Sequence, residues 1–279
     1  MTASDSPTIT QFTDPMCTWC WGAEPIRRRL QTAYGDRLTH RFVLGGLIED
    51  FETFYDAAND ISDPEDVGPH WLAAAERHGM PVDTEIFEVD PAQSTYPASV
   101  AVAAARQQGW EAGHRYLRRV REAYATEVRN VNRPAIQREI AADLGLDIGA
   151  FRAAIDDGTA REAFEEDLAR TREARIGSFP TYRLTGPEGT RTLAGFRSFE
   201  ELADTLETVA PSLERTSPPA VEQFVREYGP VATQEVATVC ALSHGKATQT
   251  LKSLADRDTL VREQRGTGVF WRVPAESTG

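Results

Sequence analysis

Residues Thr13 to Gly22 read Thr-Asp-Pro-Met-Cys-Thr-Trp-Cys-Trp-Gly, with two residues between Cys17 and Cys20. The preceding run Thr8–Phe12 alternates polar and apolar residues, which predicts a short strand. The following segment Pro25–Leu30 is compatible with a helix. This order places the first cysteine at a helix N-terminus, where unpaired backbone N–H groups and the helix dipole stabilise a thiolate.

The turn before the pair bears on which cysteine reacts. Asp14 and Pro15 favour a turn that exposes Cys17, whereas Cys20 is expected one helical turn deeper. Because a thiolate attacks disulfides and a thiol does not, we expect Cys17 to be the more acidic and more reactive sulfur, and Cys20 to resolve mixed disulfides. The alternative, two inert core cysteines, fits the polar turn poorly.

The nine residues Asp14–Gly22 resemble the active-site signature of the DsbA-like thioredoxin superfamily, nearest to its cytosolic branch related to FrnE and the SpxH-type adaptors. The resemblance implies a thioredoxin core with a helical insertion. It also implies dithiol–disulfide exchange, with Cys17 and Cys20 as catalytic residues and no cofactor.

Pro180 is the third catalytic residue that the resemblance implies. In this superfamily a cis-proline precedes the third strand and packs against the dithiol, and Phe179-Pro180-Thr181 fits that place. The cis bond leaves the preceding backbone free to pair with an extended substrate. Phe179 and Thr181 are therefore expected to bind substrate. A trans proline at the start of an edge strand is the alternative.

Acidic and aromatic residues surround the cysteines. Asp14 is a candidate proton relay for Cys20, although a solvated turn charge explains it equally well, and Glu24 is expected to be a solvated helix charge. Trp19 and Trp21 flank Cys20. We assign Trp19 to an apolar substrate lip, while at least one of the two tryptophans is expected to pack in the core.

A zinc site is the competing interpretation of the cysteines. Cys240 and His244 are four residues apart and, on one helical face, would complete a tetrahedral set with Cys17 and Cys20. The two halves belong to separate expected domains, so no metal is predicted. Cys240 is expected to be a buried helix residue.

Composition bears on the environment of the protein. The net charge is −13, and Lys246 and Lys252 are the only lysines. This indicates a halophilic source, with an ordinary acidic soluble protein as the alternative. The segment Met1–Pro7 does not resemble a signal peptide, and no segment is long and apolar enough to span a bilayer. We therefore expect a cytoplasmic protein without membrane contact, whose three cysteines do not form a structural disulfide framework.

The remaining chain predicts an α/β fold with a thioredoxin-like core at residues 1–210. A second strand, Thr39–Leu44, ends at Gly45-Gly46, which either allow close packing near the cysteines or form an ordinary turn. A helical insertion follows at about residues 56–176, then the hairpin strands Thr181–Leu184 and Arg191–Ala194 and a helix capped by Ser198 with Glu201. The expected helices of the insertion are Val67–His78, Tyr96–Gln108, Gly109–Val128, Arg133–Leu144, Ile148–Asp156 and Thr159–Arg175.

A linker at residues 211–218 precedes a small domain at residues 219–279. Its pattern is three helices (Pro219–Tyr228, Thr233–Ala241, His244–Asp256) and two strands (Leu260–Glu263, Val269–Val273), which resembles a winged helix-turn-helix. Residues 215–279 carry eight basic and seven acidic side chains, a net charge of +1, so the preceding residues carry −14. Affinity for DNA depends mostly on neutralised phosphates, so DNA binding through Lys252 and a wing Arg265 is possible but not favoured over a protein partner.

The sequence thus predicts a cytosolic thiol–disulfide oxidoreductase acting on protein or small-molecule disulfides and thiols. Its alternatives are a redox-responsive adaptor or transcription regulator, and a glutathione-dependent isomerase related to the kappa-class transferases. Those relatives usually carry a serine and lack the resolving cysteine, so Cys20 argues against the last. We expect exchange activity to survive removal of residues 215–279.

Overall fold

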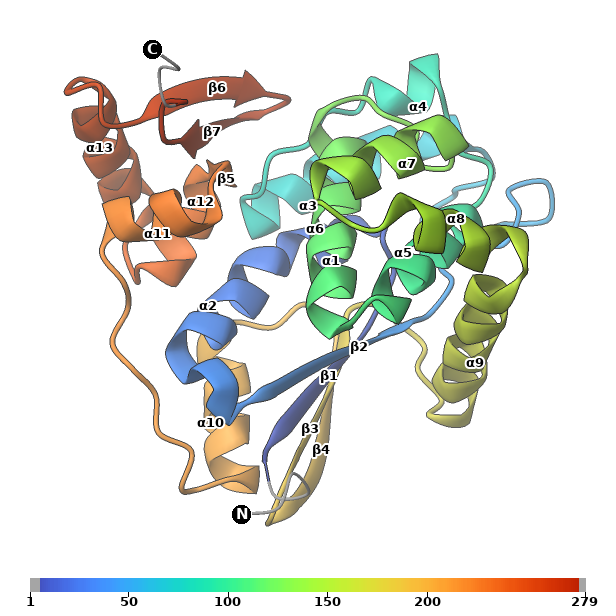
Figure 1. The fold of residues 1–279 in the computed structure, drawn as a ribbon, viewed down its shortest axis with the longest axis horizontal. Coiled ribbons are helices and arrows are strands. Elements are labelled where there is room, and N and C mark those ends of the chain that lie inside the picture. The colour runs from blue at the N-terminus through green and yellow to red at the C-terminus, as the bar shows by residue number, and fades with distance from the viewer. Residues whose placement is uncertain (1–5, 276–279) are drawn as a thin grey trace.

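The computed structural model describes residues 6–275 (Figure 1). The expected ends of the two domains, residues 1 and 279, and most of the segment Met1–Pro7 lie outside the described residues. Within the described part of the chain, no helix combines the length and the apolar character needed to cross a membrane.

A four-stranded mixed sheet carries the N-terminal part. Its strands are β1 (Thr8–Thr13), β2 (Thr39–Leu44), β3 (Thr181–Gly186) and β4 (Gly189–Ala194), in the order β2-β1-β3-β4. β1 runs parallel to β2 and antiparallel to β3, and β3 is antiparallel to β4. The first two strands are confirmed as expected. The hairpin strands are longer because Gly186 pairs with Gly189, which leaves a shorter turn than expected.

Helices α2 (Glu24–Tyr34) and α10 (Phe199–Val209) pack against the sheet. The crossover from β1 to β2 contains α1 (Thr18–Gly22), α2 and the 3-10 helix η1 (Gly35–Arg37), and α10 follows the hairpin. A buried apolar cluster that includes Ile9, Leu30, Leu184 and Leu206 joins the sheet to α2 and α10. The expected capping box at the start of α10 is confirmed, since Ser198 and Glu201 bond reciprocally.

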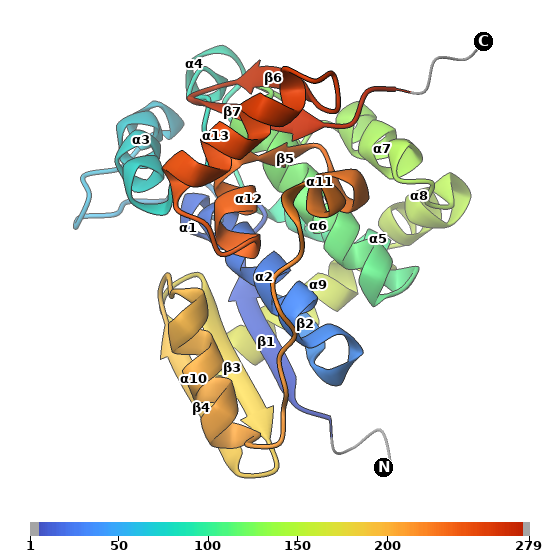
Figure 2. The ribbon, with the colours of Figure 1, turned by 90° about the vertical axis from the view of Figure 1, so that its left-hand side faces the viewer.

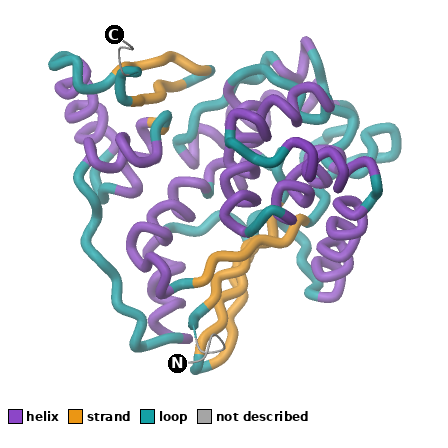
Figure 3. Tube along the Cα trace, viewed as in Figure 1, coloured by secondary structure: helices purple, strands orange, loops and turns teal. Residues whose placement is uncertain are grey.

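The insertion between β2 and β3 is helical, as expected (Figure 3). The expected helix ends lie within two residues of the observed ones, which is the usual uncertainty of frayed termini. Helix α5 is buried along Ala98–Ala105, where small residues allow its neighbours to approach closely. The elements are η2 (Pro64–Asp66), α3 (Val67–His78), the unexpected short α4 (Ile86–Val89), α5 (Tyr96–Gln107), α6 (Trp110–Thr126), α7 (Pro134–Asp143), α8 (Ile148–Asp156) and α9 (Thr159–Glu173).

Residues 219–275, here the C-terminal region, contain three helices and a three-stranded sheet of order β5-β7-β6. The helices and the hairpin follow the expected order, while β5 was not expected. Val236, Val239, Leu251 and Leu254 are buried in its core as expected, and Leu242 is only partly buried. The elements are α11 (Val221–Tyr228), β5 (Val231–Ala232), α12 (Thr233–Val239), α13 (His244–Ala255), β6 (Val261–Arg265) and β7 (Gly268–Arg272).

The C-terminal region packs on the rest of the chain, here the body, instead of hanging from a free linker (Figure 2). Helix α12 lies against α2, and Phe270 and Ala232 belong to the apolar core of the insertion. The turn between β6 and β7 reaches the body, where the N–H of Thr267 donates to the carbonyl of Val82 at 2.9 Å. The C-terminal region is therefore partly built into the body.

Candidate active site

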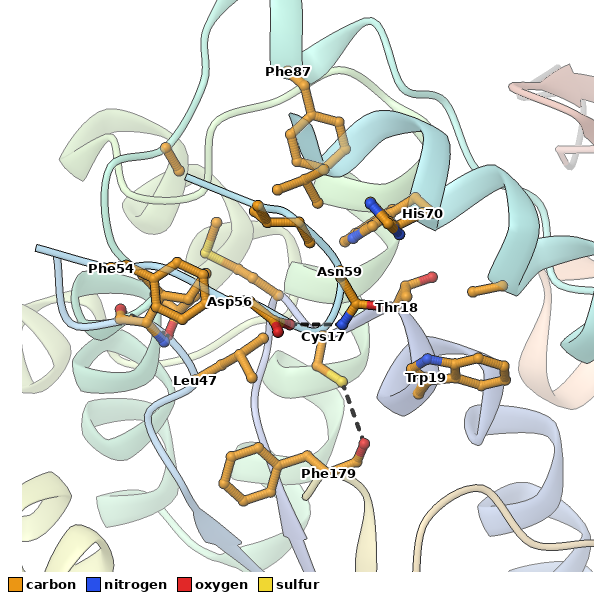
Figure 4. Close-up of a pocket in the computed structure, with 18 of the residues that line it drawn as sticks. Cys17, Thr18, Trp19, Leu47, Phe54, Asp56, Asn59, His70, Phe87 and Phe179 are labelled. Atoms are coloured by element: carbon orange, nitrogen blue, oxygen red, sulfur yellow. Dashed lines mark hydrogen bonds between the residues drawn. The ribbon is translucent and has the colours of Figure 1, made fainter. Parts of the chain in front are cut away.

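Cys17 is the N-cap residue of α1. Its backbone is extended (φ −88°, ψ 122°), and its Sγ accepts a hydrogen bond from the N–H of Cys20 at 3.4 Å. On its other side the S–H donates to the carbonyl oxygen of Phe179 at 3.8 Å, the dashed line between them in Figure 4. The expected position at a helix N-terminus is confirmed, although α1 has only five residues.

The two sulfurs differ in access. Cys17 is 5% exposed and forms part of the wall of a cavity of about 480 Å³, whereas Cys20 is 0% exposed and does not line that cavity. Both are free thiols in this structure. Apolar side chains such as Leu47, Phe54 and Phe87 dominate the cavity, with His70, Asp56 and Asn59 among its few polar ones (Figure 4). Ligands that enter this cavity meet Cys17 and not Cys20.

The two thiols titrate as a coupled pair. The pKa of Cys17 is raised first by its interaction with the neighbouring sulfur of Cys20, and burial raises it further. Burial also raises the pKa of Cys20, but the interaction with Cys17, the charge of Arg121 and the hydroxyl of Thr13 outweigh burial, so that pKa is lowered. Within the pair, the shifts therefore favour the thiol form of Cys17 and the thiolate form of Cys20, and the expectation that Cys17 is the more acidic thiol stays a prediction.

Arg121 of α6 supplies the positive charge near Cys20, and no sequence pattern singled it out. Its buried guanidinium forms an ion pair with Glu24 and hydrogen bonds with the hydroxyl of Thr13 and the carbonyl oxygen of Asp14. Arg121 is 97 residues from Glu24 in the chain, so the only available signal was its place in an arginine-rich helix.

The expectation that Glu24 is a solvated helix charge is wrong. Its side chain is 1% exposed, not solvated. Burial raises its pKa, but the charges of Arg27 and Arg121 lower it more, so the carboxylate stays ionised. The acid and the two arginines form a buried ionic layer behind the cysteines.

Asp14 is fully buried, and hydrogen bonds occupy both of its carboxylate oxygens. They accept from the N–H of Met16 (2.8 Å), the N–H of Leu47 (2.9 Å) and the hydroxyl of Thr95 (2.8 Å). Burial outweighs these bonds and raises the pKa of Asp14. Its carboxylate thus ties the turn before Cys17 to the insertion.

The two tryptophans separate as the sequence led us to expect. Trp21 is 1% exposed in the core, and its Nε1 donates to the carbonyl of Pro81 at 2.8 Å. Trp19 is half-buried, lines the cavity and meets the ring of His78 edge-on, with ring centres 5.9 Å apart.

His78, which no sequence pattern singled out, packs against α1. Its Nδ1 accepts from the N–H of Met80 at 3.1 Å, so the neutral ring carries its proton on Nε2, 3.3 Å from the hydroxyl of Thr18. Burial lowers the pKa of His78 to about 4. Gly22, the last residue of α1, packs against this ring with no room for a side chain, because a Cβ there would lie 2.4 Å from the His78 Cγ.

The segment Phe179–Thr181 faces the dithiol from β3. The peptide bond between Phe179 and Pro180 is cis, as expected. Thr181 is buried, and its hydroxyl donates to the carbonyl of Ser178 at 2.7 Å. The ring of Phe179 covers Gly45, where a Cβ would lie 1.9 Å from the ring Cζ. Of the two interpretations of that glycine, the structure supports close packing near the cysteines.

Cys240 and His244 do not share a helical face. Cys240 follows α12 and His244 begins α13, so the expectation for this pair is wrong. Cys240 is buried in the C-terminal region, and burial raises its pKa to about 11. Within residues 6–275, no three His, Cys, Asp or Glu side chains are placed to hold a metal ion.

Comparisons with known proteins agree with this geometry. Residues 11–196 match the family described as Thioredoxin. The ClpXP adapter protein SpxH of Halalkalibacterium halodurans is 32% identical over 95% of this chain and 88% of its own length. A putative protein disulfide isomerase from Nitrosomonas europaea superposes with a TM-score of 0.62, at 22% identity over 73% of this chain and 97% of its own.

A second solved structure is more similar in sequence. The cytosolic disulfide reductase DsbM from Pseudomonas aeruginosa is 25% identical, with a TM-score of 0.55 over 67% of this chain and 88% of its own. The chain therefore belongs to the thioredoxin family, with a DsbA-like fold and SpxH-related relatives.

Proposed function

We propose that this protein is a cytoplasmic thiol–disulfide oxidoreductase whose redox couple is Cys17 and Cys20. The observation that carries the proposal is a cavity-lining thiol beside a fully buried partner thiol. Two-step exchange needs an accessible nucleophile and a second sulfur that a substrate cannot reach. Similarity to DsbM, whose name is cytosolic disulfide reductase, supports the activity and the compartment.

The exchange proceeds in two balanced steps. Cys17 gives up its proton, and the Cys17 thiolate attacks one sulfur of a substrate disulfide. A Cys17–substrate disulfide forms and one substrate thiolate leaves with that proton. Cys20 then attacks the Cys17 sulfur, so the protein disulfide forms and the second substrate thiolate leaves. The substrate gains two electrons and the pair loses them, and the reverse sequence oxidises a dithiol.

The remaining site residues receive roles in this proposal. The backbone of Phe179 to Thr181, including Pro180, holds an extended substrate beside Cys17, which the contact between the Phe179 carbonyl and the Cys17 sulfur supports. Trp19 forms the apolar lip at the cavity. Asp14 is proposed as the proton relay for Cys20, since burial raises the pKa of its carboxyl above the ordinary value.

A reductase assay on insulin, with dithiothreitol as electron donor, tests the activity. Cys17→Ser is expected to abolish turnover, because the nucleophile is lost. Cys20→Ser is expected to accumulate a mixed disulfide on Cys17, visible by mass spectrometry. Cys240→Ser is the matched control, since this buried cysteine lies in the core of the C-terminal region, and it should retain the wild-type rate. A Cys17→Ser variant as active as the control would refute the proposal.

A second function, that of a protein adaptor, is favoured by one observation. Similarity to the protein named ClpXP adapter SpxH covers 95% of this chain, well past residue 196 where the family match ends. We propose that residues 211–218 link the DsbA-like domain to a winged helix-turn-helix-like domain that binds protein. DNA binding is less favoured because Arg265, expected on the wing, instead bonds to Glu122 and Glu127 of the body.

The two functions separate in one experiment. A variant with both Cys17→Ser and Cys20→Ser loses thiol exchange but keeps the surface of the C-terminal region. An adaptor of this kind would still form a complex with a ClpX-type unfoldase in size-exclusion chromatography. If neither the variant nor the wild type forms that complex, the adaptor proposal fails while the oxidoreductase proposal stands.

A further inference from the structure

A second cavity, of about 660 Å³, lies between the body and the C-terminal region, and none of its lining residues is a cysteine. Helix α3 provides one wall with Leu72 and Glu76, and α13 provides the other with His244 and Lys252. We call this cavity the α3–α13 groove. It forms only because the C-terminal region docks on the body, so neither part has it alone.

One face of α13 points into the groove. His244, Thr248 and Lys252 line it and are spaced four residues apart, which places them in a row along one side of a helix. Arg262 of the edge strand β6 lines it as well. A row of polar side chains that ends in the Lys252 ammonium thus faces α3 across the groove.

The groove is cationic in an acidic protein. Of the ionised side chains that line it, Lys252 and Arg262 are positive and Glu76 is negative. Among the described residues, neither Lys252 nor Arg262 has an ion-pair partner, whereas Arg265 on the same hairpin pairs with three carboxylates. The residues before 215 carry a net charge of −14. The two unpaired cations beside them therefore make the groove locally positive in a negatively charged protein.

The groove also has an apolar contact point. Leu72 is 42% exposed and is one of four large hydrophobic side chains exposed within residues 6–275. Single exposed leucines are ordinary, but Leu72 lies in a concave surface together with Val269 and Pro81. Apolar and cationic groups therefore line the same cavity.

We propose that the α3–α13 groove binds an acidic peptide segment of a partner protein, with its carboxylates on Lys252 and Arg262 and an apolar side chain on Leu72. A peptide suits the groove better than duplex DNA does. The α13 row faces another helix across the groove, so it is not presented to a DNA groove as an exposed recognition helix would be. The interaction does not involve the thiols, so it is independent of the proposed redox activity.

Selection of displayed random peptides on the full-length protein tests this proposal. The enriched sequences are expected to combine Asp or Glu with a large apolar residue. A fluorescein-labelled enriched peptide is then titrated by fluorescence anisotropy against the wild type and two variants. Lys252→Gln with Arg262→Gln should weaken binding about tenfold, and Leu72→Ser should weaken it severalfold.

Two control variants remove the same kinds of side chain, a lysine and an exposed apolar residue, at positions outside the groove. Lys246→Gln removes the other lysine of α13, and Val89→Ser removes another exposed apolar side chain, and both should bind like the wild type. The Cys17→Ser variant should also bind normally. Enrichment without acidic residues, equal binding by the groove variants, or preferential Lys252-dependent binding of a labelled random DNA duplex would each overturn the proposal.

Discussion

Glu235 and Arg118 join the C-terminal region to the body directly behind the dithiol helix. The Oε2 of Glu235 accepts from Nη2 of Arg118 at 2.9 Å, and the Glu235 side chain is 0% exposed. The guanidinium of Arg118 lies 4.5 Å from the centre of the Trp21 ring, and Trp21 directly follows Cys20. Arg28 of α2 approaches the other carboxylate oxygen of Glu235 at 3.6 Å. A residue of the C-terminal region thus stabilises the back of the active-site helix.

Glu235→Gln should lower the free energy of unfolding by about 3 kcal/mol, because it leaves the buried Arg28 without its counter-charge and removes one of the two carboxylates paired with the buried Arg118. Denaturant unfolding followed by circular dichroism measures the loss. Glu222→Gln is the control, since Glu222 forms an exposed pair with Arg226 and its loss should cost at most about 0.5 kcal/mol. Equal midpoints for the two variants would contradict a stabilising role for Glu235.

Removal of residues 215–279 should impair the whole protein, contrary to the expectation from sequence that activity survives. The truncation removes Glu235, the counter-charge of Arg28 and one of the two carboxylates paired with Arg118, and takes Phe270 and Ala232 out of the core of the insertion. We expect a lower melting temperature and reduced turnover in the insulin assay. A truncated protein that melts and reacts like the wild type would show that the C-terminal region is only an appended domain.

The sequence and the structure lead to opposite expectations for the truncated protein, because sequence patterns predict only part of the structure. The strand before Cys17, the helix after it and the Ser198 capping box depend on residues close together in the chain, and all three are present in the structure. The place of Phe179-Pro180 followed from the family resemblance instead. Local periodicity and resemblance thus sufficed for most of the fold.

The residues that support the site were not predictable in this way. Glu24 was judged solvated because acidic residues are usually exposed, and its partner Arg121 is 97 residues away. Glu235 is 117 residues from Arg118. Such pairs form only when α2, α6 and α12 pack together, and a composition of +1 for the C-terminal residues cannot reveal which of their charges are buried.

Gly45→Ala should slow thiol exchange by about tenfold or more, because its Cβ would collide with the Phe179 ring and shift the carbonyl that contacts Cys17. The insulin assay measures the effect. Gly177→Ala is a matched control near Phe179, where a Cβ meets nothing within 4 Å. If both variants turn over equally, the position of Phe179 does not matter for exchange.

His78 should make the protein less stable in mild acid. Its folded pKa is about 4, below the ordinary 6.5, so the unfolded chain binds a proton that the folded chain does not. Stability is therefore greatest above about pH 6.5 and falls as the pH drops towards 4, by about 2 kcal/mol at about pH 5. His78→Gln removes this titration and should make the pH dependence of the free energy of unfolding less steep, measured in denaturant; burial also lowers the pKa values of His40 and His114, so part of the dependence remains. An unchanged slope would mean that the pKa of His78 is the same in the folded and the unfolded chain.

Thr13→Val should make the thiol pair less acidic. The buried hydroxyl of Thr13 accepts from Arg121 and lowers the pKa of Cys20, while valine keeps the shape without the oxygen. We expect the first apparent pKa of the pair to rise by about one unit, followed by the ultraviolet absorbance of the thiolate in a Cys240→Ser background. Because the reduced form loses thiolate stabilisation, the Cys17–Cys20 disulfide should also become harder to reduce, and its reduction potential should fall. Thr10→Val in the same strand is the control. If it shifts the titration as much as Thr13→Val does, the hydroxyl of Thr13 has no specific role at Cys20.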